Sequence, residues 1–364
     1  MTRSCIALLS GGLDSLLAMR LMALQGIRVV ALHAENCFHG TERPESARER
    51  IGNAAIKLGA AETAFPDLTG ETIAIVKKPK YGYGRNLNPC IDCRLLTIRA
   101  GFDLMTEKGA DFLVSGEVVG QRPMSQRRDA VRLVDRLAAE WGFAGLHLRP
   151  LSARLLDMTI PETKNWIDRK LLFGISGRGR RIQMELAERV GLGVYPTPAG
   201  GCLLTDACFS GRLADLMRFT PDWGAEEVEL LKVGRHYLPG PATRIVASRS
   251  EDENRRLGEL ARPEDFLYIN AEKNGAVVLL RGAKTDRFEA LSAGLAVFFS
   301  KMRERGRACV RRWREGREDE APEREFAVVD PETLRELEKR VRSSWNAGIS
   351  SIGGDPVAPP RERS

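Results

Sequence analysis

One glycine-rich string near the N-terminus constrains the fold more than any other feature of this sequence. The string Ser10-Gly11-Gly12-Leu13-Asp14-Ser15 follows a short apolar run at residues 5–9. Leucines then recur at helical spacing from Leu16 to Leu24. A strand, a tight loop and a helix are therefore expected in that order, with unpaired backbone N–H groups at the start of the helix.

The alternation of strand and helix continues along the chain. A second apolar run covers residues 27–34, residues 44–58 have helical spacing, and a later apolar run at residues 110–115 ends in Gly116-Glu117. This order predicts a parallel sheet with helices on both faces. Because ligands bind beyond the carboxyl ends of parallel strands, the loops after Leu9, Ala34 and Ser115 should converge on one site.

The composition of the glycine string suits a phosphate group. Glycines let the backbone approach a phosphate closely, and the hydroxyls of Ser10 and Ser15 can donate further hydrogen bonds. Asp14 would repel a phosphate unless a cation stands between them, so we interpret it as a helix cap, a Mg²⁺ contact or both. An ordinary glycine turn is the structural alternative, and the length of the string argues against it.

Cysteines in two later motifs form a second set of candidate residues. The motif Asn88-Pro89-Cys90-Ile91-Asp92-Cys93 places two thiols near an expected helix N-terminus, where the helix dipole should lower the thiol pKa. Cys202 follows a turn rich in proline and glycine at residues 195–201. These thiols could react or hold a metal, and buried structural cysteines are the alternative. The seven cysteines of the chain, an odd number, favour thiol or metal chemistry over a disulfide framework.

The glycine string, the N-P-C-x-x-C motif and Gly200-Gly201-Cys202 together make residues 4–206 resemble the tRNA 2-thiouridylases, which carry the PP-loop of the N-type ATP pyrophosphatases. That family splits ATP to AMP and pyrophosphate, adenylates a uridine oxygen and replaces the oxygen by sulfur. The resemblance implies that Cys93 and Cys202 handle the sulfur. It also implies an ATP and Mg²⁺ site formed by Ser10, Gly11, Gly12, Asp14, Ser15 and Gly116.

Two positions depart from the better-known members of that family. Cys90 stands where they usually carry aspartate, and Gly116-Glu117 replaces a glycine–histidine pair. We expect Cys90, Cys93 and Cys202 to hold three irons of a four-iron cluster whose fourth iron binds sulfide, as in some similar thiolases. The alternative is a persulfide on one cysteine that is released when a second cysteine forms a disulfide. The sulfur donor would be a persulfide carrier or sulfide.

The composition changes after residue 212, where short strands and one helix are expected. Residues 232–300 resemble the RNA-binding domain of the NFACT proteins. Between residues 301 and 317, eight basic residues stand against two glutamates. Phosphate contacts and base stacking are therefore expected, with a solvated charged face as the alternative. The candidate RNA-binding residues are Arg235, Arg311, Arg312 and Trp313.

We therefore predict an α/β catalytic domain, a parallel-sheet domain of the adenine-nucleotide alpha-hydrolase (PP-loop) type, at residues 1–212. A small α+β domain that binds RNA should occupy residues 213–346, and a disordered tail residues 347–364. The net charge of +7 favours a polyanionic partner such as tRNA. No apolar run approaches the ~20 residues of a membrane helix and no signal sequence is evident, so a cytoplasmic protein is expected.

Two other functions stay open at this point. One is a PP-loop ligase or amidase that forms AMP while activating a small carboxylate, although no glutaminase-like segment is apparent. The other is an RNA-binding factor that ATP switches between conformations without sulfur transfer. A zinc hydrolase is not supported, because the four histidines lack metal-ligand spacing.

Overall fold

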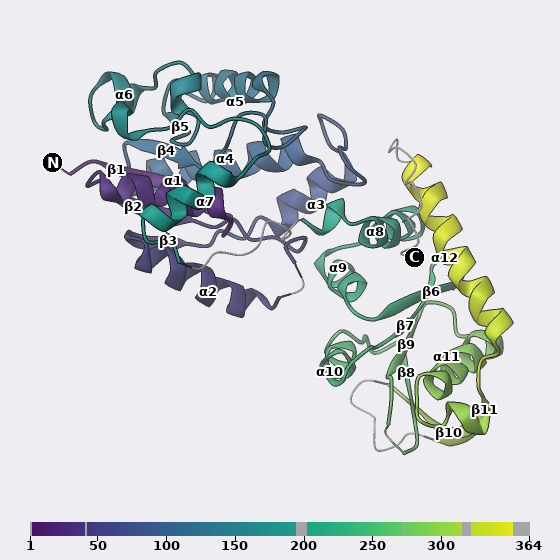
Figure 1. Cartoon of the computed structure of the whole chain (residues 1–364). Coiled ribbons are helices and arrows are strands. Elements are labelled where there is room, and N and C mark those ends of the chain that lie inside the picture. The colour runs from purple at the N-terminus through teal and green to yellow at the C-terminus, as the bar shows by residue number, and fades with distance from the viewer. Residues whose placement is uncertain (1, 41, 194–201, 273, 315–321, 352–364) are drawn as a thin grey trace. The chain divides into compact units, whose positions relative to one another are not determined.

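The computed structural model describes residues 2–40, 42–193, 202–272, 274–314 and 322–351, and the side chains of the last helix as far as Val341. The chain forms two compact units (Figure 1). The first unit comprises residues 1–84 and 88–202, and the second comprises residues 85–87 and 203–364. Residues 85–87 thus belong to the second unit although they lie within the sequence of the first.

The first unit is built on a five-stranded sheet in the order β3-β2-β1-β4-β5, and every neighbouring pair in it is parallel. The chain moves outward from β1 to β3 and then returns to the other side of β1. The order therefore reverses between β1 and β4, which makes the carboxyl ends of these two strands the expected binding crevice. The strands are β1 (Ser4–Leu8), β2 (Arg28–Leu32), β3 (Ala60–Ala64), β4 (Phe112–Ser115) and β5 (His147–Leu148).

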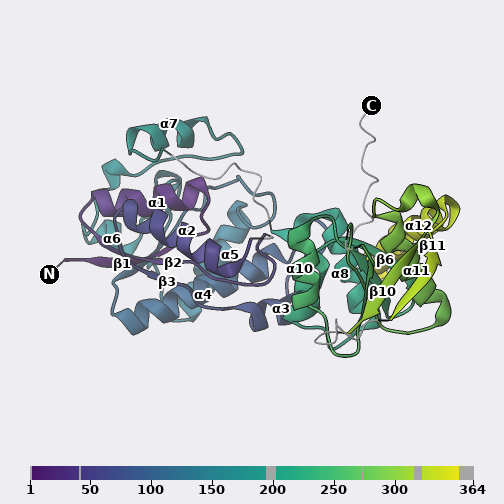
Figure 2. The same ribbon diagram turned by 90° about the horizontal axis from the view of Figure 1, so that it is seen from below.

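Helices cover both faces of this sheet. They are α1 (Leu13–Leu24), α2 (Pro44–Lys57), α3 (Thr69–Lys77), α4 (Cys90–Lys108), α5 (Arg128–Glu140), α6 (Ile160–Thr163) and α7 (Arg181–Arg189), with 3₁₀ turns η1 (Ala153–Leu155) and η2 (Arg169–Leu171). Figure 2 shows α1, α2 and α7 on one side of the sheet and α4 on the other.

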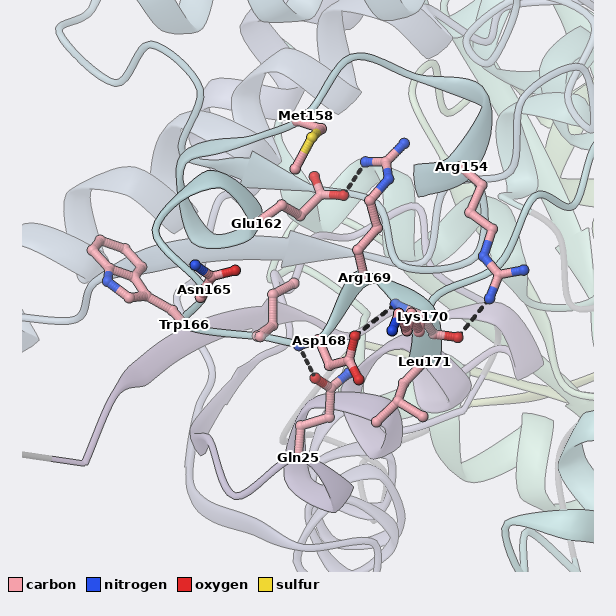
Figure 3. Close-up of a pocket in the computed structure, with 11 residues that line it drawn as sticks. Gln25, Arg154, Met158, Glu162, Asn165, Trp166, Asp168, Arg169, Lys170 and Leu171 are labelled. Atoms are coloured by element: carbon pink, nitrogen blue, oxygen red, sulfur yellow. Dashed lines mark hydrogen bonds and ion pairs between the residues drawn. The ribbon is translucent and has the colours of Figure 1, made fainter.

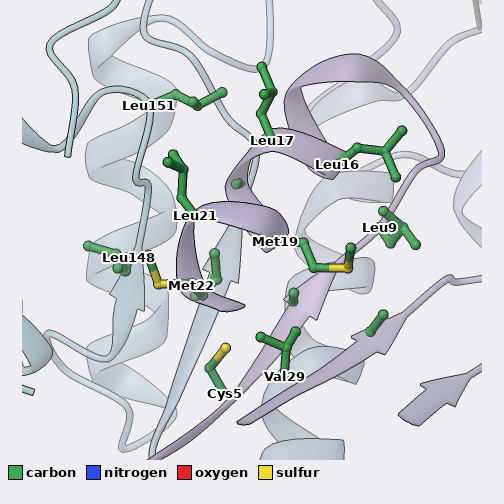
Figure 4. Close-up of a cluster of buried hydrophobic side chains, with 14 of the residues drawn as sticks. Cys5, Leu9, Leu16, Leu17, Met19, Leu21, Met22, Val29, Leu148 and Leu151 are labelled. Atoms are coloured by element: carbon green, nitrogen blue, oxygen red, sulfur yellow. The ribbon is translucent and has the colours of Figure 1, made fainter. Parts of the chain in front are cut away.

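Strand β1 contributes side chains to the hydrophobic cores on both faces of this sheet. Cys5 and Ala7 of β1 pack with α1, α2 and α7, and part of this core is drawn in Figure 4. Ile6, between them in sequence, packs with α4 and α5 on the other face. A strand buried on both faces has no polar side, which explains why β1 is a continuous apolar run in the sequence.

The second unit contains a six-stranded antiparallel sheet in the order β11-β10-β8-β9-β7-β6. Its strands are β6 (Arg235–Gly240), β7 (Thr243–Ala247), β8 (Phe266–Asn270), β9 (Val278–Arg281), β10 (Arg307–Trp313) and β11 (Glu323–Ala327). Its helices are α8 (Ala207–Phe219), α9 (Ala225–Lys232), α10 (Glu251–Glu259), α11 (Asp286–Phe298) and α12 (Pro331–Ser351), with 3₁₀ turns η3 (Leu203–Thr205) and η4 (Arg303–Arg305).

Helices also cover both faces of the antiparallel sheet. On one face, Leu295 of α11 and Leu337 of α12 pack with strand residues such as Tyr268. On the other face, Leu230 of α9 and Leu257 of α10 pack against the alternate residues of the same strands. A buried ion pair between Arg244 of β7 and Asp215 of α8, 3.0 Å long, ties α8 to this sheet.

The predicted fold class is confirmed: a parallel α/β unit precedes a smaller α+β unit. The predicted domain boundaries stay predictions, although the first unit already ends at Cys202 and α12 extends beyond residue 346. Residues 352–364 of the expected disordered tail lie outside the described residues. None of the helices described is both long and apolar enough to cross a membrane.

Candidate nucleotide and thiol site

The glycine string folds into a closed loop between β1 and α1. Gly11 has a φ of 77°, in the left-handed region that favours glycine. The Ser15 hydroxyl donates to the Gly12 carbonyl at 2.8 Å and accepts from the Ser10 backbone N–H at 3.2 Å. Gly12 is the N-cap of α1 and makes no side-chain cap, so the loop presents the start of a twelve-residue helix to any anion bound there.

The end of β4 packs directly against this loop. A Cβ atom at Gly116 would lie 2.4 Å from the Ser15 nitrogen and 2.5 Å from the Asp14 carbonyl oxygen. These atoms belong to the backbone and have no room to move aside, so only glycine fits at residue 116. The predicted convergence of the loops that follow β1 and β4 is therefore present in the structure.

Asp14 is held by a chain of side-chain amides. Its Oδ2 accepts a hydrogen bond of 2.5 Å from Gln121, and Gln121 in turn accepts one of 3.0 Å from Gln183 on α7. Arg180 lies 3.8 Å from the same Asp14 oxygen. The other oxygen, Oδ1, is buried and has no hydrogen-bond partner among the described residues. An unpartnered carboxylate oxygen beside a phosphate loop fits a Mg²⁺ ion that takes its remaining ligands from phosphates and water.

Gln183 and Arg180 were not among the residues predicted from the sequence. Gln183 is completely buried although it lies in an otherwise exposed stretch of α7. The available signal was weak, because a glutamine between Ile182 and Met184 is typical of an ordinary helix. Its role depends on α7 packing against the sheet, which the local sequence does not encode.

The three candidate cysteines belong to the same unit as the glycine loop. Cys90 is the first residue of α4, and its sulfur accepts a hydrogen bond of 3.5 Å from Asn88. Cys93 follows one turn later. Cys202 forms an isolated antiparallel bridge with His39, in the loop after β2. Residues 195–201, the proline- and glycine-rich turn expected to present Cys202, lie outside the described residues.

Cys90 and Cys202 lie close enough to Cys93 to affect its pKa, but the site does not make Cys93 acidic. Burial raises the pKa of Cys93 to about 12, and negative charge on Cys202, Cys90 and Asp92 raises it as well. The expectation that the helix N-terminus favours the thiolate is therefore wrong for Cys93. The loss of hydration outweighs the helix dipole, whose effect is confined to the first turn.

The cysteines do not form a preassembled metal site. Within the described residues, no three His, Cys, Asp or Glu side chains are grouped closely enough to hold a metal ion. The thiol donors have the right chemistry for iron, and the four-iron cluster expected from the sequence stays a prediction.

A buried ion-pair network connects the cysteine helix to β4. Glu117, which follows Gly116, contacts Arg94 of α4 and pairs with Arg149 at 2.7 Å. Arg149 also pairs with Asp135 at 2.8 Å. Burial lowers the pKa of Arg94 to about 10, and Glu117 opposes that shift. Glu117 is therefore committed to two guanidinium groups and is not available as a base.

The candidate RNA-binding residues of the second unit are already engaged in intramolecular contacts. Arg311 pairs with Glu323 at 2.6 Å, and Arg312 pairs with Glu289 at 2.5 Å. Trp313 packs against the core beneath α9 and α10. The Arg235 guanidinium lies 4.8 Å from the Phe299 ring centroid and donates to the Ser248 carbonyl. RNA contacts at these positions stay predictions.

One cavity in the described part of the chain lies away from the glycine loop. It has a volume of about 860 Å³ and is lined by residues such as Gln25, Trp166 and Lys170 (Figure 3). Gln25 caps the far end of α1, about 18 Å from the glycine loop at 1.5 Å per residue. The polar groups that line the cavity largely bond to one another, as Arg169 does to Glu162. We therefore do not assign the nucleotide to this cavity.

Two segments of the chain match known protein families. Residues 1–144 match the family model described as thiamine biosynthesis protein (ThiI). Residues 234–336 match the model described as NFACT protein RNA binding domain. The chain thus joins a segment that matches the ThiI model to a segment that matches the NFACT model. The ThiI segment contains the glycine loop, Cys90, Cys93 and Gly116, and the resemblances inferred from the motifs are confirmed at this level.

Individual relatives cover only parts of the chain. The probable tRNA sulfurtransferase of Methanosarcina acetivorans is 28% identical over 122 residues, which are 32% of this chain and 28% of that protein. The chain therefore spans less than a third of the length of this curated relative.

Two solved structures show weaker similarity. A 4-thiouridine synthetase in complex with RNA and bound ATP is 17% identical, covering 52% of this chain and 50% of that one, with a TM-score of 0.31. The U34-tRNA thiolase NcsA from Methanococcus maripaludis with its four-iron, four-sulfur cluster is 14% identical, covering 65% and 74%, with a TM-score of 0.26. Because both TM-scores are low, the site residues are assigned from the geometry of this chain alone.

Proposed function

We propose that this protein is an ATP-dependent tRNA thiolase that adenylates a uridine oxygen and replaces it with sulfur. The observation that carries the proposal is the presence, in one compact unit, of a glycine loop locked by Gly116 and of Cys90 and Cys202 close enough to Cys93 to raise its pKa. The match to ThiI, the tRNA sulfurtransferase relative and the NFACT match support the same reaction and an RNA substrate.

The glycine loop supplies the adenylation half of the reaction. Backbone N–H groups at the start of α1 and the hydroxyl of Ser10 would bind the phosphates of ATP. Asp14 would hold Mg²⁺ through its unpartnered Oδ1, and the ion would neutralise charge on the leaving group. The uridine carbonyl oxygen attacks the α-phosphorus, the bond to the β-phosphate breaks, and pyrophosphate leaves.

The cysteines supply the sulfur half of the reaction. A persulfide donor transfers one sulfur atom to Cys93 or Cys202, and the terminal sulfur attacks the adenylated carbon. AMP leaves with the former uridine oxygen. The thiolate of the second cysteine then attacks the first cysteine's sulfur, which frees the thiouridine and leaves a disulfide. A cellular dithiol must reduce this disulfide before the next turnover.

The high pKa of Cys93 bears on which cysteine acts first. Thiol–disulfide exchange needs a thiolate, and burial keeps Cys93 protonated near neutral pH. We therefore assign the persulfide to Cys202 and propose that Cys93 becomes a thiolate only when the substrate and its cations alter the site.

The proposal is tested with purified protein, ATP, Mg²⁺ and bulk tRNA. Release of AMP and pyrophosphate should require tRNA, and thiouridine should form only when a persulfide donor is present. Asp14→Ala should abolish pyrophosphate release, and so should Ser15→Ala, which also removes the hydrogen bonds that close the loop. AMP release with a small carboxylate in place of tRNA would instead establish a ligase.

Iron analysis of anaerobically purified protein separates the persulfide route from the four-iron cluster expected from the sequence. The persulfide route predicts iron-free protein that still thiolates tRNA, and full activity in Cys90→Ala. Stoichiometric iron and sulfide together with an inactive Cys90→Ala variant would reject that route.

A further inference from the structure

Three cationic side chains of the second unit surround one aromatic ring. The Lys284 ammonium lies 5.6 Å from the centroid of the Phe266 ring, and the guanidinium carbons of Arg312 and Arg314 lie 4.6 Å and 4.9 Å from it. All three distances are within the range of a cation–π contact. We call Lys284, Arg312 and Arg314 the Phe266 cluster.

The register of the sheet brings this cluster together. Arg312 of β10 lies opposite Tyr268 of β8, and Trp313 lies opposite Leu267, so Arg314 continues along the same edge toward Phe266. Side chains alternate between the two faces of a strand, which puts Arg312 and Arg314 on one face and Trp313 on the other. Lys284 reaches the same face from the short loop before α11.

The cluster carries more positive charge than the carboxylates described around it neutralise. Arg312 pairs with Glu289, and nearby Arg281 pairs with the buried carboxylate of Asp265 at 2.6 Å. In the described part of the chain, Lys284 and Arg314 make no ion pair with a carboxylate: Lys284 donates to the Gly282 carbonyl at 2.9 Å, and Arg314 contacts the Phe266 ring. Among the residues that the structure describes, these two cations thus lie near one another without a paired carboxylate.

The pKa of Lys284 agrees with this imbalance. Partial burial lowers the pKa, and the positive charges of Arg281 and Arg314 lower it further, although Asp265 and Glu264 oppose the change. A bound anion would relieve the repulsion between the cations. Arginine and lysine presented side by side are the groups that bind phosphates in RNA, the arginine as a fork and the lysine as a point charge.

Other arginines of β10 differ from the cluster in one respect. Arg307 pairs with Glu325 at 3.1 Å and Arg311 pairs with Glu323, both across the hairpin to β11. Among the described residues, the basic groups here are therefore not equivalent: Arg307 and Arg311 pair with β11 and Arg312 pairs with Glu289, whereas Arg314 and the neighbouring Lys284 have no paired carboxylate. The surface around Phe266 is therefore the part of the described unit that we expect an anionic partner to contact.

We propose that Lys284, Arg312 and Arg314 form a phosphate-binding cluster that holds the sugar–phosphate backbone of RNA. The proposal rests on the proposed function, which makes tRNA the ligand. It differs from the RNA contacts expected from the sequence, because it places binding at Lys284 and Arg314 and assigns Arg311 and Trp313 to the fold.

The test measures tRNA binding by the full chain over a range of salt concentrations, without ATP or a sulfur donor. Removing one phosphate-binding cation should reduce the slope of log affinity against log salt by about 0.9 for duplex and about 0.7 for single-stranded RNA. The double variant Lys284→Gln, Arg314→Gln should therefore bind more weakly and with a shallower slope. The matched control is Arg307→Gln, which removes a neutralised arginine from the same strand and should leave the slope unchanged.

A slope in the double variant equal to that of the unaltered protein would overturn the proposal, and so would an equally reduced slope in Arg307→Gln. Neither substituted cluster residue makes an ion pair within the described residues, so the melting temperature should stay close to that of the unaltered protein and show that the fold is intact. Pyrophosphate release at saturating tRNA distinguishes a failure of the phosphate-binding cluster from a failure of the thiolase proposal. If release requires tRNA but the slope does not change, the cluster is wrong and the thiolase proposal stands.

Discussion

Gly116 shows how strongly one missing side chain shapes the nucleotide site. Gly116→Ala would place a methyl group 2.4 Å from the Ser15 nitrogen, so β4 and the loop must separate. We expect at least tenfold weaker ATP binding, measured by calorimetric titration. Gly70→Ala is the matched control, because a Cβ at Gly70 of α3 meets no atom within 4 Å. Equal ATP affinity in both variants would contradict the site assignment.

The thiol of Cys93 should react slowly with alkylating agents at neutral pH. Its pKa of about 12 means that the thiolate fraction, and with it the alkylation rate, rises about tenfold per pH unit between pH 7 and 10. Mass spectrometry of iodoacetamide-treated protein should show exposed Cys208 and Cys309 modified first and Cys93 last. Modification of Cys93 as early as Cys208 at pH 7.5 would show that its thiolate is stabilised in solution.

At the scale of secondary-structure elements, the Glu117 network fixes helix α4 to strand β4. Glu117→Gln would leave Arg94 and Arg149, both buried, without the carboxylate that they share. Breaking a buried ion pair by removing one partner costs about 3–5 kcal/mol of unfolding free energy. Urea denaturation measures this destabilisation.

Arg99→Gln is the control for that measurement. It breaks an exposed pair with Asp103, 3.0 Å long, on the same helix, and exposed pairs contribute about 0.3–0.5 kcal/mol. A Glu117→Gln variant that is no less stable than Arg99→Gln would show that the network does not stabilise this unit.

The elements that could be predicted from the sequence are those with a strong local pattern. The strand before Ser10, the helix from Leu13 and the strand before Gly116 are all present, because apolar runs closed by glycine depend little on distant residues. Short edge strands such as β3 and β5 were not predicted. They are two to five residues long and have no periodicity of their own.

Features of the site that depend on packing could not be predicted in the same way. The amide chain from Gln183 to Asp14 joins residues far apart in the sequence, and no spacing rule connects them. The pKa of Cys93 was predicted in the wrong direction, because the sequence shows the helix start but not the burial. The charges around Phe266 were also hidden, since they depend on which arginines of β10 find a glutamate on β11.

At the scale of the whole molecule, the two units have separate cores and should respond differently to ATP. A ligand that binds one unit at a hundred times its Kd stabilises that unit by about 2.7 kcal/mol. We expect two thermal transitions in scanning calorimetry, of which Mg²⁺ and ATP raise only the one that belongs to the first unit. A single transition that shifts as a whole would show that the units unfold together.

Any truncation that tests the second unit should respect its boundary. A deletion that starts at residue 232 would keep α8 and α9 but remove the strands on which they pack, including Arg244, the buried partner of Asp215. Such a protein would expose part of the core beneath α9, so more than RNA binding would be affected. A cut after Cys202 keeps the whole first unit and retains, of the second unit, only residues 85–87.

Those three residues give the chain an unusual connectivity. Two domains fused end to end are joined by one covalent connection, whereas this chain crosses between its units after Gly84, after Leu87 and after Cys202. Asn86 donates a hydrogen bond of 2.8 Å to the carbonyl of Thr205, so the inserted segment is anchored in the second unit. Cys90 lies three residues after the crossing at Leu87, and Cys202 is the last residue before the final crossing. The backbone thus forms a pair of tethers, so a displacement of the second unit would pull on the chain beside Cys90 and beside Cys202 at the same time.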